Sequence, residues 1–138
     1  MSAVIELKVG SRQHSLDRVR SITRSIITRM SFDDEAIAHV DLAVREALIN
    51  AIKHGNRNLE SMQVDVTFAI EADRFTVYIR DRGPGFEPSR VPDPRHSNHS
   101  LRPSGRGIFL MRSFMDEVEY STHPDGGSIV RMSKYKPR

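Results

Sequence analysis

The amino-acid sequence predicts an α/β (α+β) sandwich of two layers, in which about three helices cover one face of a mixed, mostly antiparallel sheet. Two observations lead to this fold class. In three segments, apolar residues recur at three- and four-residue steps, the spacing of one helix face. In the remaining segments, apolar and polar residues alternate as they do in half-buried strands. The order is strand, two helices, hairpin, long loop, helix, hairpin. Helices gathered on one side of antiparallel pairs give this two-layer arrangement.

The composition predicts one soluble domain spanning residues 1–138. Apolar content is 38% and charged content 28%, which is ordinary for a globular protein. The chain contains no cysteine, so it has neither a disulfide framework nor a thiolate metal site. No apolar run approaches the roughly 20 residues that span a bilayer, and the first residues lack the apolar core of a signal peptide. We therefore expect a cytoplasmic protein without a membrane partner.

The net charge is weak support for a nucleic-acid partner. Lysine and arginine total 21 against 18 aspartates and glutamates, a formal charge of +3. The basic residues are dispersed and no aromatic residues are interleaved among them, unlike a typical nucleic-acid interface. Small ligands that carry phosphate would suit the same charge.

The first half of the chain predicts a strand followed by two helices. Residues 3–9 form a short strand that Gly10 and Ser11 interrupt. An amphipathic helix follows over residues 13–30. Residues 31–34 are a helix-start signal, with acidic residues suited to a first turn. The second helix is expected over residues 33–54.

Two hairpins are predicted in the second half. Alternating residues mark strands at 64–68 and 75–79, the second of which ends at Asp81. Val118 and Tyr120 fit a third strand, residues 124–127 a turn, and residues 129–135 a last strand. A helix over residues 108–115 lies between the hairpins.

The second helix carries an acid, an amide and a base at helical spacing. Glu46, Asn50 and Lys53 stand at i, i+4 and i+7, so they share one narrow stripe. Gly55 is expected to end the helix in a left-handed conformation. The main apolar stripe lies on roughly the opposite side. The polar stripe therefore faces either water, the usual place for charged residues, or a bound ligand.

Two glycine motifs follow downstream. Asp81-Arg82-Gly83-Pro84-Gly85 is a turn whose glycines let backbone approach a ligand closely. Gly105-Arg106-Gly107 is expected to open the third helix, where free amides make a phosphate site. Between them, residues 87–104 show no periodicity and hold four of the seven prolines, as in a functional lid or a disordered segment. His96 and His99 in this loop are a poor metal site without a third ligand.

These three motifs, in this order, resemble the N, G1 and G2 boxes of the ATPase superfamily shared by gyrase, heat-shock chaperones, sensor histidine kinases and mismatch-repair ATPases. Within it, the sequence is most similar to the anti-sigma-factor serine/threonine kinases. The likeness runs from the first strand to the last. It is carried by residues 43–47, 50–55, 79–83, 104–107 and 114–118. The resemblance implies the histidine-kinase-like ATPase fold, with residues 87–104 as the ATP lid.

The resemblance also implies roles for individual residues. Asn50 is expected to coordinate Mg²⁺, for which an amide oxygen is a suitable ligand. Glu46 is expected to act as general base on the attacking hydroxyl. Asp81 is expected to bind the adenine amino group and Arg18 to contact a partner protein. The remaining residues implied to contact ATP are Lys53, Gly83, Gly85, Gly105, Arg106 and Gly107.

The function implied is that of a kinase and anti-sigma factor. It would use ATP and Mg²⁺ to phosphorylate an anti-anti-sigma protein, and would hold a sigma factor when that antagonist is phosphorylated. Family members form homodimers, so a homodimer is expected. The alternative is an adaptor that binds ATP and switches partners without catalysis. The lid departs from the family pattern, because Pro103 separates Arg102 from Ser104.

Overall fold

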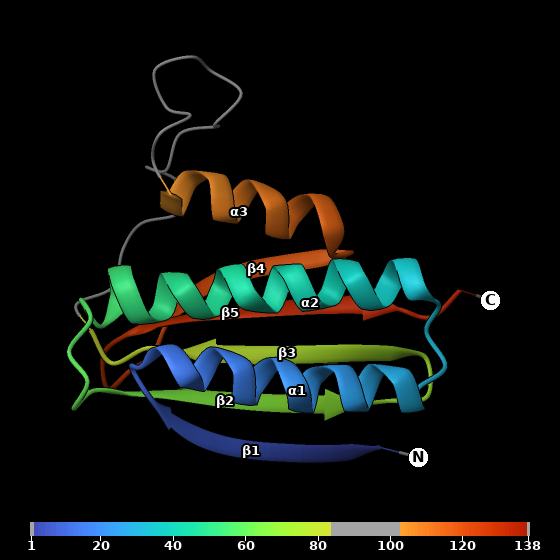
Figure 1. The fold of residues 1–138 in the computed structure, drawn as a ribbon, viewed down its shortest axis with the longest axis horizontal. Helices are drawn as coiled ribbons and strands as arrows, with labels where there is room; N and C mark the ends of the chain where they lie inside the picture. The colour runs from blue at the N-terminus through green and yellow to red at the C-terminus, as the bar shows by residue number, and fades with distance from the viewer. Residues whose placement is uncertain (1, 84–102, 138) are drawn as a thin grey trace.

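The computed structural model describes residues 2–83 and 103–137, with the side chains of 103–106 left out. The elements follow the predicted order (Figure 1). They are β1 (Ala3–Gly10), α1 (Gln13–Arg29), α2 (Asp34–Ile49), the π-helix η1 (Asn50–Gly55), β2 (Gln63–Ile70), β3 (Arg74–Arg80), α3 (Pro103–Phe114), β4 (Glu117–Thr122) and β5 (Ser128–Tyr135).

The five strands form one sheet in the order β1-β2-β3-β5-β4. Each of the four pairings is antiparallel, so the described part of the sheet is antiparallel throughout rather than mixed. The three helices lie side by side over one face of this sheet, with α2 in the middle (Figure 1). The predicted two-layer architecture is confirmed.

The core lies between the two layers. Alternate residues of each strand point to the helices, and the registers Val66↔Ile79 and Val77↔Met132 place buried side chains opposite one another. The expected apolar stripe of α2 supplies the other half of the core. Val40, Val44 and Leu48 are completely buried.

The second sheet face is largely polar. Thr76 and Ser133 share a hydrogen bond of 2.8 Å there. On the same face, Arg131 pairs with Glu119 at 2.8 Å and with Glu117 at 3.0 Å. Alternation along each strand therefore gives the sheet one apolar side, and the helices cover that side. The described residues include no helix with the length and apolar character to cross a membrane.

The start of α2 agrees with its sequence signal. The Asp33 side chain accepts a hydrogen bond of 2.8 Å from the Ala36 amide, as an N-cap residue does. Asp34 and Glu35 follow in the first turn, where negative charge is favourable.

Candidate functional site

Glu46 and Asn50 lie on the side of α2 and η1 that faces α3. The Glu46 side chain is 16% exposed and Asn50 is 3% exposed. A β-carbon added to Gly107 of α3 would lie 3.0 Å from Glu46 Oε2 and 3.3 Å from Asn50 Nδ2. The backbone of α3 therefore approaches the carboxylate and the amide closely, and it does so at a glycine.

The Asn50 side chain is buried, but not all of its hydrogen-bonding atoms have partners. Its Nδ2 atom makes no hydrogen bond within the described residues. An unpaired buried polar atom costs free energy and calls for an explanation, of which a bound ligand is one. The acid–amide pair at i, i+4 is thus in a partly enclosed site rather than on a solvated face.

Tyr120 of β4 completes this side of the site. Burial raises the pKa of its phenol, and the adjacent polar side chain of Asn50 opposes the shift. The Tyr120 hydroxyl also lies 3.8 Å from Met111 Sδ on α3. The sequence marked Tyr120 only as a strand residue.

Arg45 forms an ion pair with Glu46. Its guanidinium lies 2.8 Å from Glu46 Oε1, and its side chain is 42% exposed. This pair engages one carboxylate oxygen of Glu46. The other oxygen, Oε2, is the one nearest to Gly107.

Asp81 lies directly after β3 and is 2% exposed. Its Oδ1 atom accepts hydrogen bonds from the amides of Gly83 at 3.1 Å and Ser128 at 3.2 Å. Burial raises the pKa of the carboxyl group, and these two amides oppose the rise. Two donors on one oxygen fix the orientation of the carboxyl group.

Three glycines let separate segments meet around Asp81. A β-carbon added to Gly55 would lie 2.2 Å from the Asp81 carboxyl group. One added to Gly83 would lie 1.5 Å from the backbone oxygen of Gly55, and one added to Gly127 would lie 2.0 Å from the backbone oxygen of Asp81. Separations this short exclude any side chain. The end of η1, the segment after β3 and the β4–β5 turn therefore pack backbone against backbone.

The prediction that Gly55 ends the helix in a left-handed conformation is wrong. Among the described residues, the glycines with positive φ are Gly126 and Gly127. Arg57 and Asn58 take the left-handed conformation instead, with φ of 52° and 59°. Gly55 is needed for its close approach to Asp81, which is a tertiary constraint.

The single long helix predicted over residues 33–54 is also corrected. It is α-helical to Ile49 and π-helical from Asn50 to Gly55. Because a π-helix has more residues per turn, it rotates later side chains away from the α-helical stripe. Such segments occur often at functional sites.

Lys53 shows the effect of this rotation. It lines a hollow of about 200 Å³ beside Leu16 of α1 and Ile49 and Ile52. No hydrogen bond or ion pair joins it to Glu46 or Asn50 within the described residues. Contact between Lys53 and a phosphate stays a prediction.

The third helix begins earlier than the sequence indicated. It starts at Pro103, so Gly105, Arg106 and Gly107 lie inside α3 rather than before it. Proline suits the first helical position, because its missing amide needs no partner there. In an α-helix only the first four amides lack an internal acceptor, and Gly107 is the fifth residue.

Most of the predicted lid lies outside the described residues. Gly85, His96 and His99 fall there, and residues 103–104 of the predicted loop belong to α3. Within the described chain, no group of three histidine, aspartate or glutamate residues could hold a metal ion.

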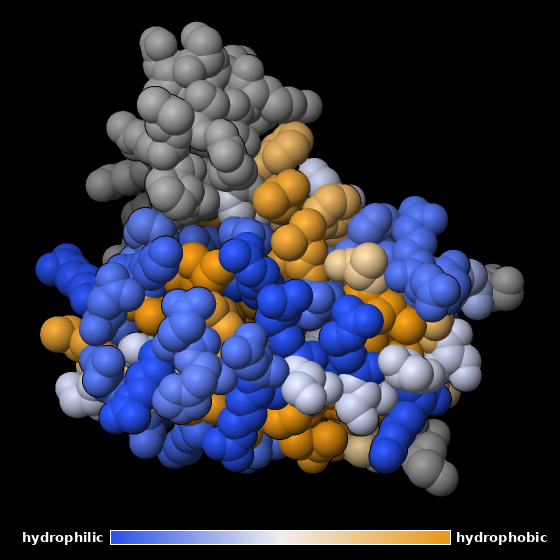
Figure 2. Space-filling model, in the orientation of Figure 1, coloured by the Kyte–Doolittle hydropathy of each residue, from blue (hydrophilic) through white to orange (hydrophobic). Residues whose placement is uncertain are grey.

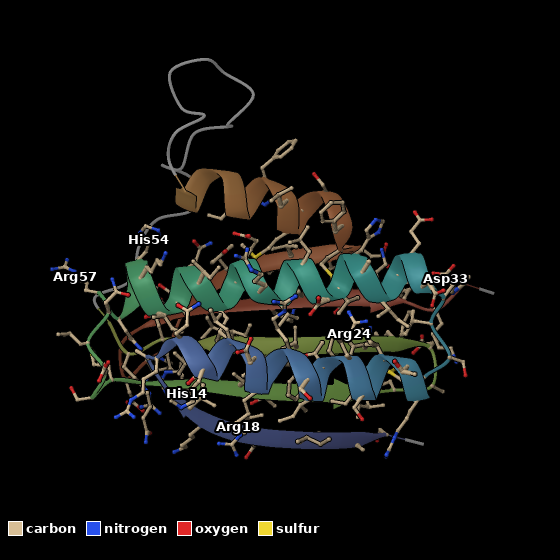
Figure 3. All side chains as sticks on the ribbon, viewed as in Figure 1. His14, Arg18, Arg24, Asp33, His54 and Arg57 are labelled. Carbon is tan, nitrogen blue, oxygen red and sulfur yellow. The ribbon has the colours of Figure 1, made fainter. Side chains whose placement is uncertain are left out.

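Arg18 lies exposed on α1, on the other side of α2 from α3 (Figure 3). This placement leaves it accessible to a partner. Its role stays a prediction.

Sequence reasoning missed Asn56, Gly127 and Ser128, all of which contact the Asp81 segment. Asn56 is completely buried, and its Oδ1 accepts a hydrogen bond of 2.7 Å from the Arg82 amide. Each of these contacts joins residues at least 26 positions apart. No local pattern could have indicated them.

Comparison with known proteins agrees with this geometry. The model of the histidine kinase-like ATPase domain family matches residues 9–134. The chain belongs to this family.

Two curated relatives refine the class. A serine-protein kinase RsbW from Oceanobacillus iheyensis is 31% identical, over 95% of this chain and 85% of its own length. An anti-sigma F factor from Thermoanaerobacter sp. is 28% identical, over 96% of this chain and 93% of its own length. The RsbU and RsbW domains of Rv1364c from Mycobacterium tuberculosis share the fold, with a TM-score of 0.69 and 16% identity over 98% of this chain and 33% of that one.

Proposed function

We propose that this protein is a serine/threonine kinase that uses Mg²⁺ and ATP and acts as an anti-sigma factor. It phosphorylates an anti-anti-sigma protein and holds a sigma factor while that antagonist is phosphorylated. The observation that carries the proposal is the approach of the α3 backbone at Gly107 to Glu46 and Asn50. This contact brings a carboxylate, an amide and the first turns of a helix to one place.

The residues present fit Mg²⁺ and ATP. The Asn50 side chain is buried, and its amide nitrogen, a hydrogen-bond donor, lacks a partner in the described residues, which suits donation to a phosphate oxygen. Amide and carboxylate oxygens suit Mg²⁺. The free amides in the first turn of α3 suit phosphate oxygens. The buried Asp81 carboxyl group suits an amino group of a base.

Each residue then has a role. Asn50 would hold the metal ion, which would neutralise phosphate charge. Gly105, Arg106 and Gly107 would bind the phosphates, Asp81 would accept a hydrogen bond from adenine, and Gly83 and Gly85 would give the base clearance. Lys53 would contact a phosphate after its side chain turns out of the hollow beside Leu16.

Glu46 acts as the general base of phosphotransfer. Its carboxylate accepts the proton of the attacking serine or threonine hydroxyl. A bond forms between that oxygen and the γ-phosphorus as the bond to the bridging oxygen breaks. ADP leaves with the bridging oxygen and its electron pair.

One observation favours the alternative, an adaptor that binds ATP without turnover. Arg45 already engages one carboxylate oxygen of Glu46 at 2.8 Å. The adaptor would use ATP for shape and exchange partners by affinity alone. The proposal otherwise includes a homodimer, a cytoplasmic location, Arg18 at the partner surface and one domain over residues 1–138.

Mass spectrometry of a phosphorylated partner tests the proposal. The protein is incubated with Mg²⁺, ATP and a candidate anti-anti-sigma protein from the same genome, and the intact mass of the partner is followed. We expect addition of one phosphate, slowed by a factor of about 10² or more in Glu46→Gln. Glu35→Gln, an exposed glutamate on the same helix, is the control.

Equal phosphate transfer by wild type and Glu46→Gln would contradict the role of Glu46. ATP binding without transfer to any partner would leave the adaptor as the function.

A further inference from the structure

Asn56 is the first residue after η1, and it is completely buried. Its amide donates a hydrogen bond of 2.8 Å to the Ala51 oxygen, five residues earlier, which closes the last π-helical turn. Asn56 therefore sits where the helix that carries Asn50 ends.

Its side chain joins three other segments. The Oδ1 atom accepts from the Arg82 amide at 2.7 Å. The Nδ2 atom donates to Ser11 Oγ at 2.9 Å and to the Gln63 oxygen at 3.1 Å. The start of β2 and the segment before α1 are thus tied to the segment after β3.

The Arg82 amide is the contact of this network that lies next to Asp81. Arg82 lies between Asp81 and Gly83, whose own amide donates to Asp81 Oδ1. Gly83 in turn packs on the Gly55 oxygen, so the backbone on both sides of Arg82 is constrained. The hydrogen bond from the Arg82 amide to Asn56 fixes the backbone between these two constrained residues.

We propose that Asn56 is a positioning residue that fixes the Asp81–Gly83 segment and thereby sets the selectivity of the site for adenine over guanine. The inference rests on the proposed function, because it takes Asp81 to be the residue that binds the base. Asn56 itself touches neither base nor phosphate in this account.

The chemistry explains why an asparagine is required. The site needs one acceptor and at least one donor on a short side chain in a buried place. Alanine would leave the Arg82 amide and the Gln63 oxygen without their partner. Aspartate would keep an acceptor for the Arg82 amide but lose the donor.

The test uses the full chain with Asn56→Ala, Asn56→Asp and Ser11→Ala. Ser11→Ala removes a different contact of the same network and leaves the Arg82 contact in place. Dissociation constants for ATP, GTP and tripolyphosphate are measured for each protein, and hydrogen exchange of the Arg82 amide is followed without nucleotide.

In Asn56→Ala we expect the preference for ATP over GTP to fall about tenfold, with tripolyphosphate binding unchanged. Arg82 amide exchange should accelerate by a similar factor. Asn56→Asp and Ser11→Ala should keep the preference even if they lower the unfolding temperature, which separates positioning from stability.

Unchanged selectivity and unchanged Arg82 exchange in Asn56→Ala would overturn the inference. A wild type that shows no preference for ATP would refute the role of Asp81 in the proposed function, and with it the selectivity assigned to Asn56. If wild type prefers ATP and Asn56→Ala keeps that preference, the inference about Asn56 is wrong while the proposed function stands.

Discussion

The two sides of α2 are built in opposite ways. Toward α1, Asp41 is 8% exposed and accepts two hydrogen bonds from Arg20, at 2.9 and 2.7 Å, with Arg24 at 3.5 Å. Toward α3 and the Asp81 segment, buried polar atoms of Asn50 and His54 lack partners within the described residues. The first side is satisfied and holds two helices together. The second side keeps unmet polar groups, as a binding site does.

The molecular surface follows the same division. Figure 2 shows a largely hydrophilic surface over α1 and apolar residues gathered over α3. On α3, Phe109 and Leu110 are half-buried. The comparison predicts that changes on the α1 side alter stability alone, whereas changes on the α3 side also alter ligand binding.

The largest effect is expected from Gly55→Ala, which would disrupt the packing on the side of α2 that faces α3 and Asp81. The new β-carbon would lie 2.2 Å from the Asp81 carboxyl group, so η1 or Asp81 must move. We expect a loss of about 3 kcal/mol in the free energy of unfolding and loss of ATP binding.

Gly10→Ala is the matched control, since its nearest neighbour would lie 3.6 Å from the added carbon. Urea unfolding measures both variants. Equal stability of the two would show that the approach at Gly55 is looser than described.

Asp41→Asn should weaken the contact between α1 and α2 without changing the candidate site. It removes the charge that two arginines face, and the guanidinium groups retain partial exposure, so we expect a loss of about 2 kcal/mol. The Arg20 contact holds the pKa of Asp41 below its usual value. Stability from this group is therefore full above the ordinary value of 3.8 and is lost as the pH falls through the lower folded-state value.

The affinity of the Asp41 variant for ATP should equal that of wild type in calorimetry. Asp17→Asn, an exposed aspartate on α1, is the control. A Kd raised together with the loss of stability would mean that the two sides of α2 are coupled.

Asp81→Asn should separate stability from binding on the site side. Burial raises the pKa of Asp81, so the charged form is disfavoured in the folded protein. Its contribution to stability is greatest below the unfolded-state value of 3.8 and is lost as the pH rises through the folded-state value. At neutral pH, the neutral amide should raise the free energy of unfolding by about 1 kcal/mol and abolish adenine binding.

Thermal unfolding at pH about 7 and about 4 checks this sign, because the gain should shrink at the lower pH. A variant that is less stable than wild type at neutral pH would refute the burial argument.

The smallest effect concerns His54. Burial, and to a lesser degree Lys53, lowers the pKa of His54 below its ordinary value of 6.5. Stability from the neutral ring is full above 6.5 and falls as the pH drops below it. In His54→Gln, the free energy of unfolding should fall less on acidification than in wild type, by a difference of less than about 1 kcal/mol.

His14→Gln, at an exposed position on α1, is the control, and urea unfolding across this pH range is the measurement (Figure 3). Identical slopes for the two variants would contradict the role of burial at His54.

The same comparison explains what the sequence could predict. Element order, fold class and the helix start signalled by residues 31–34 follow from local periodicity and capping, and the structure confirms them. The Glu46–Asn50 pair was also visible, because i, i+4 spacing brings two residues together on any helix.

The corrections come from tertiary contacts. Gly55 lies in a π-helix and packs against Asp81, which is a contact between residues 26 positions apart. Pro103 starts α3 earlier than the apolar pattern begins. Asn56 and Gly127 carried no motif, since their partners come from other strands and turns.

The measurement that tests the account most directly is a calorimetric titration of wild type and Asn50→Ala with ATP, with and without Mg²⁺. We expect wild type to bind ATP with a strong dependence on Mg²⁺, and Asn50→Ala to lose that dependence while remaining folded. Absence of ATP binding by wild type, or equal Mg²⁺ dependence in both proteins, would contradict the assignment of this side of α2 as a nucleotide site.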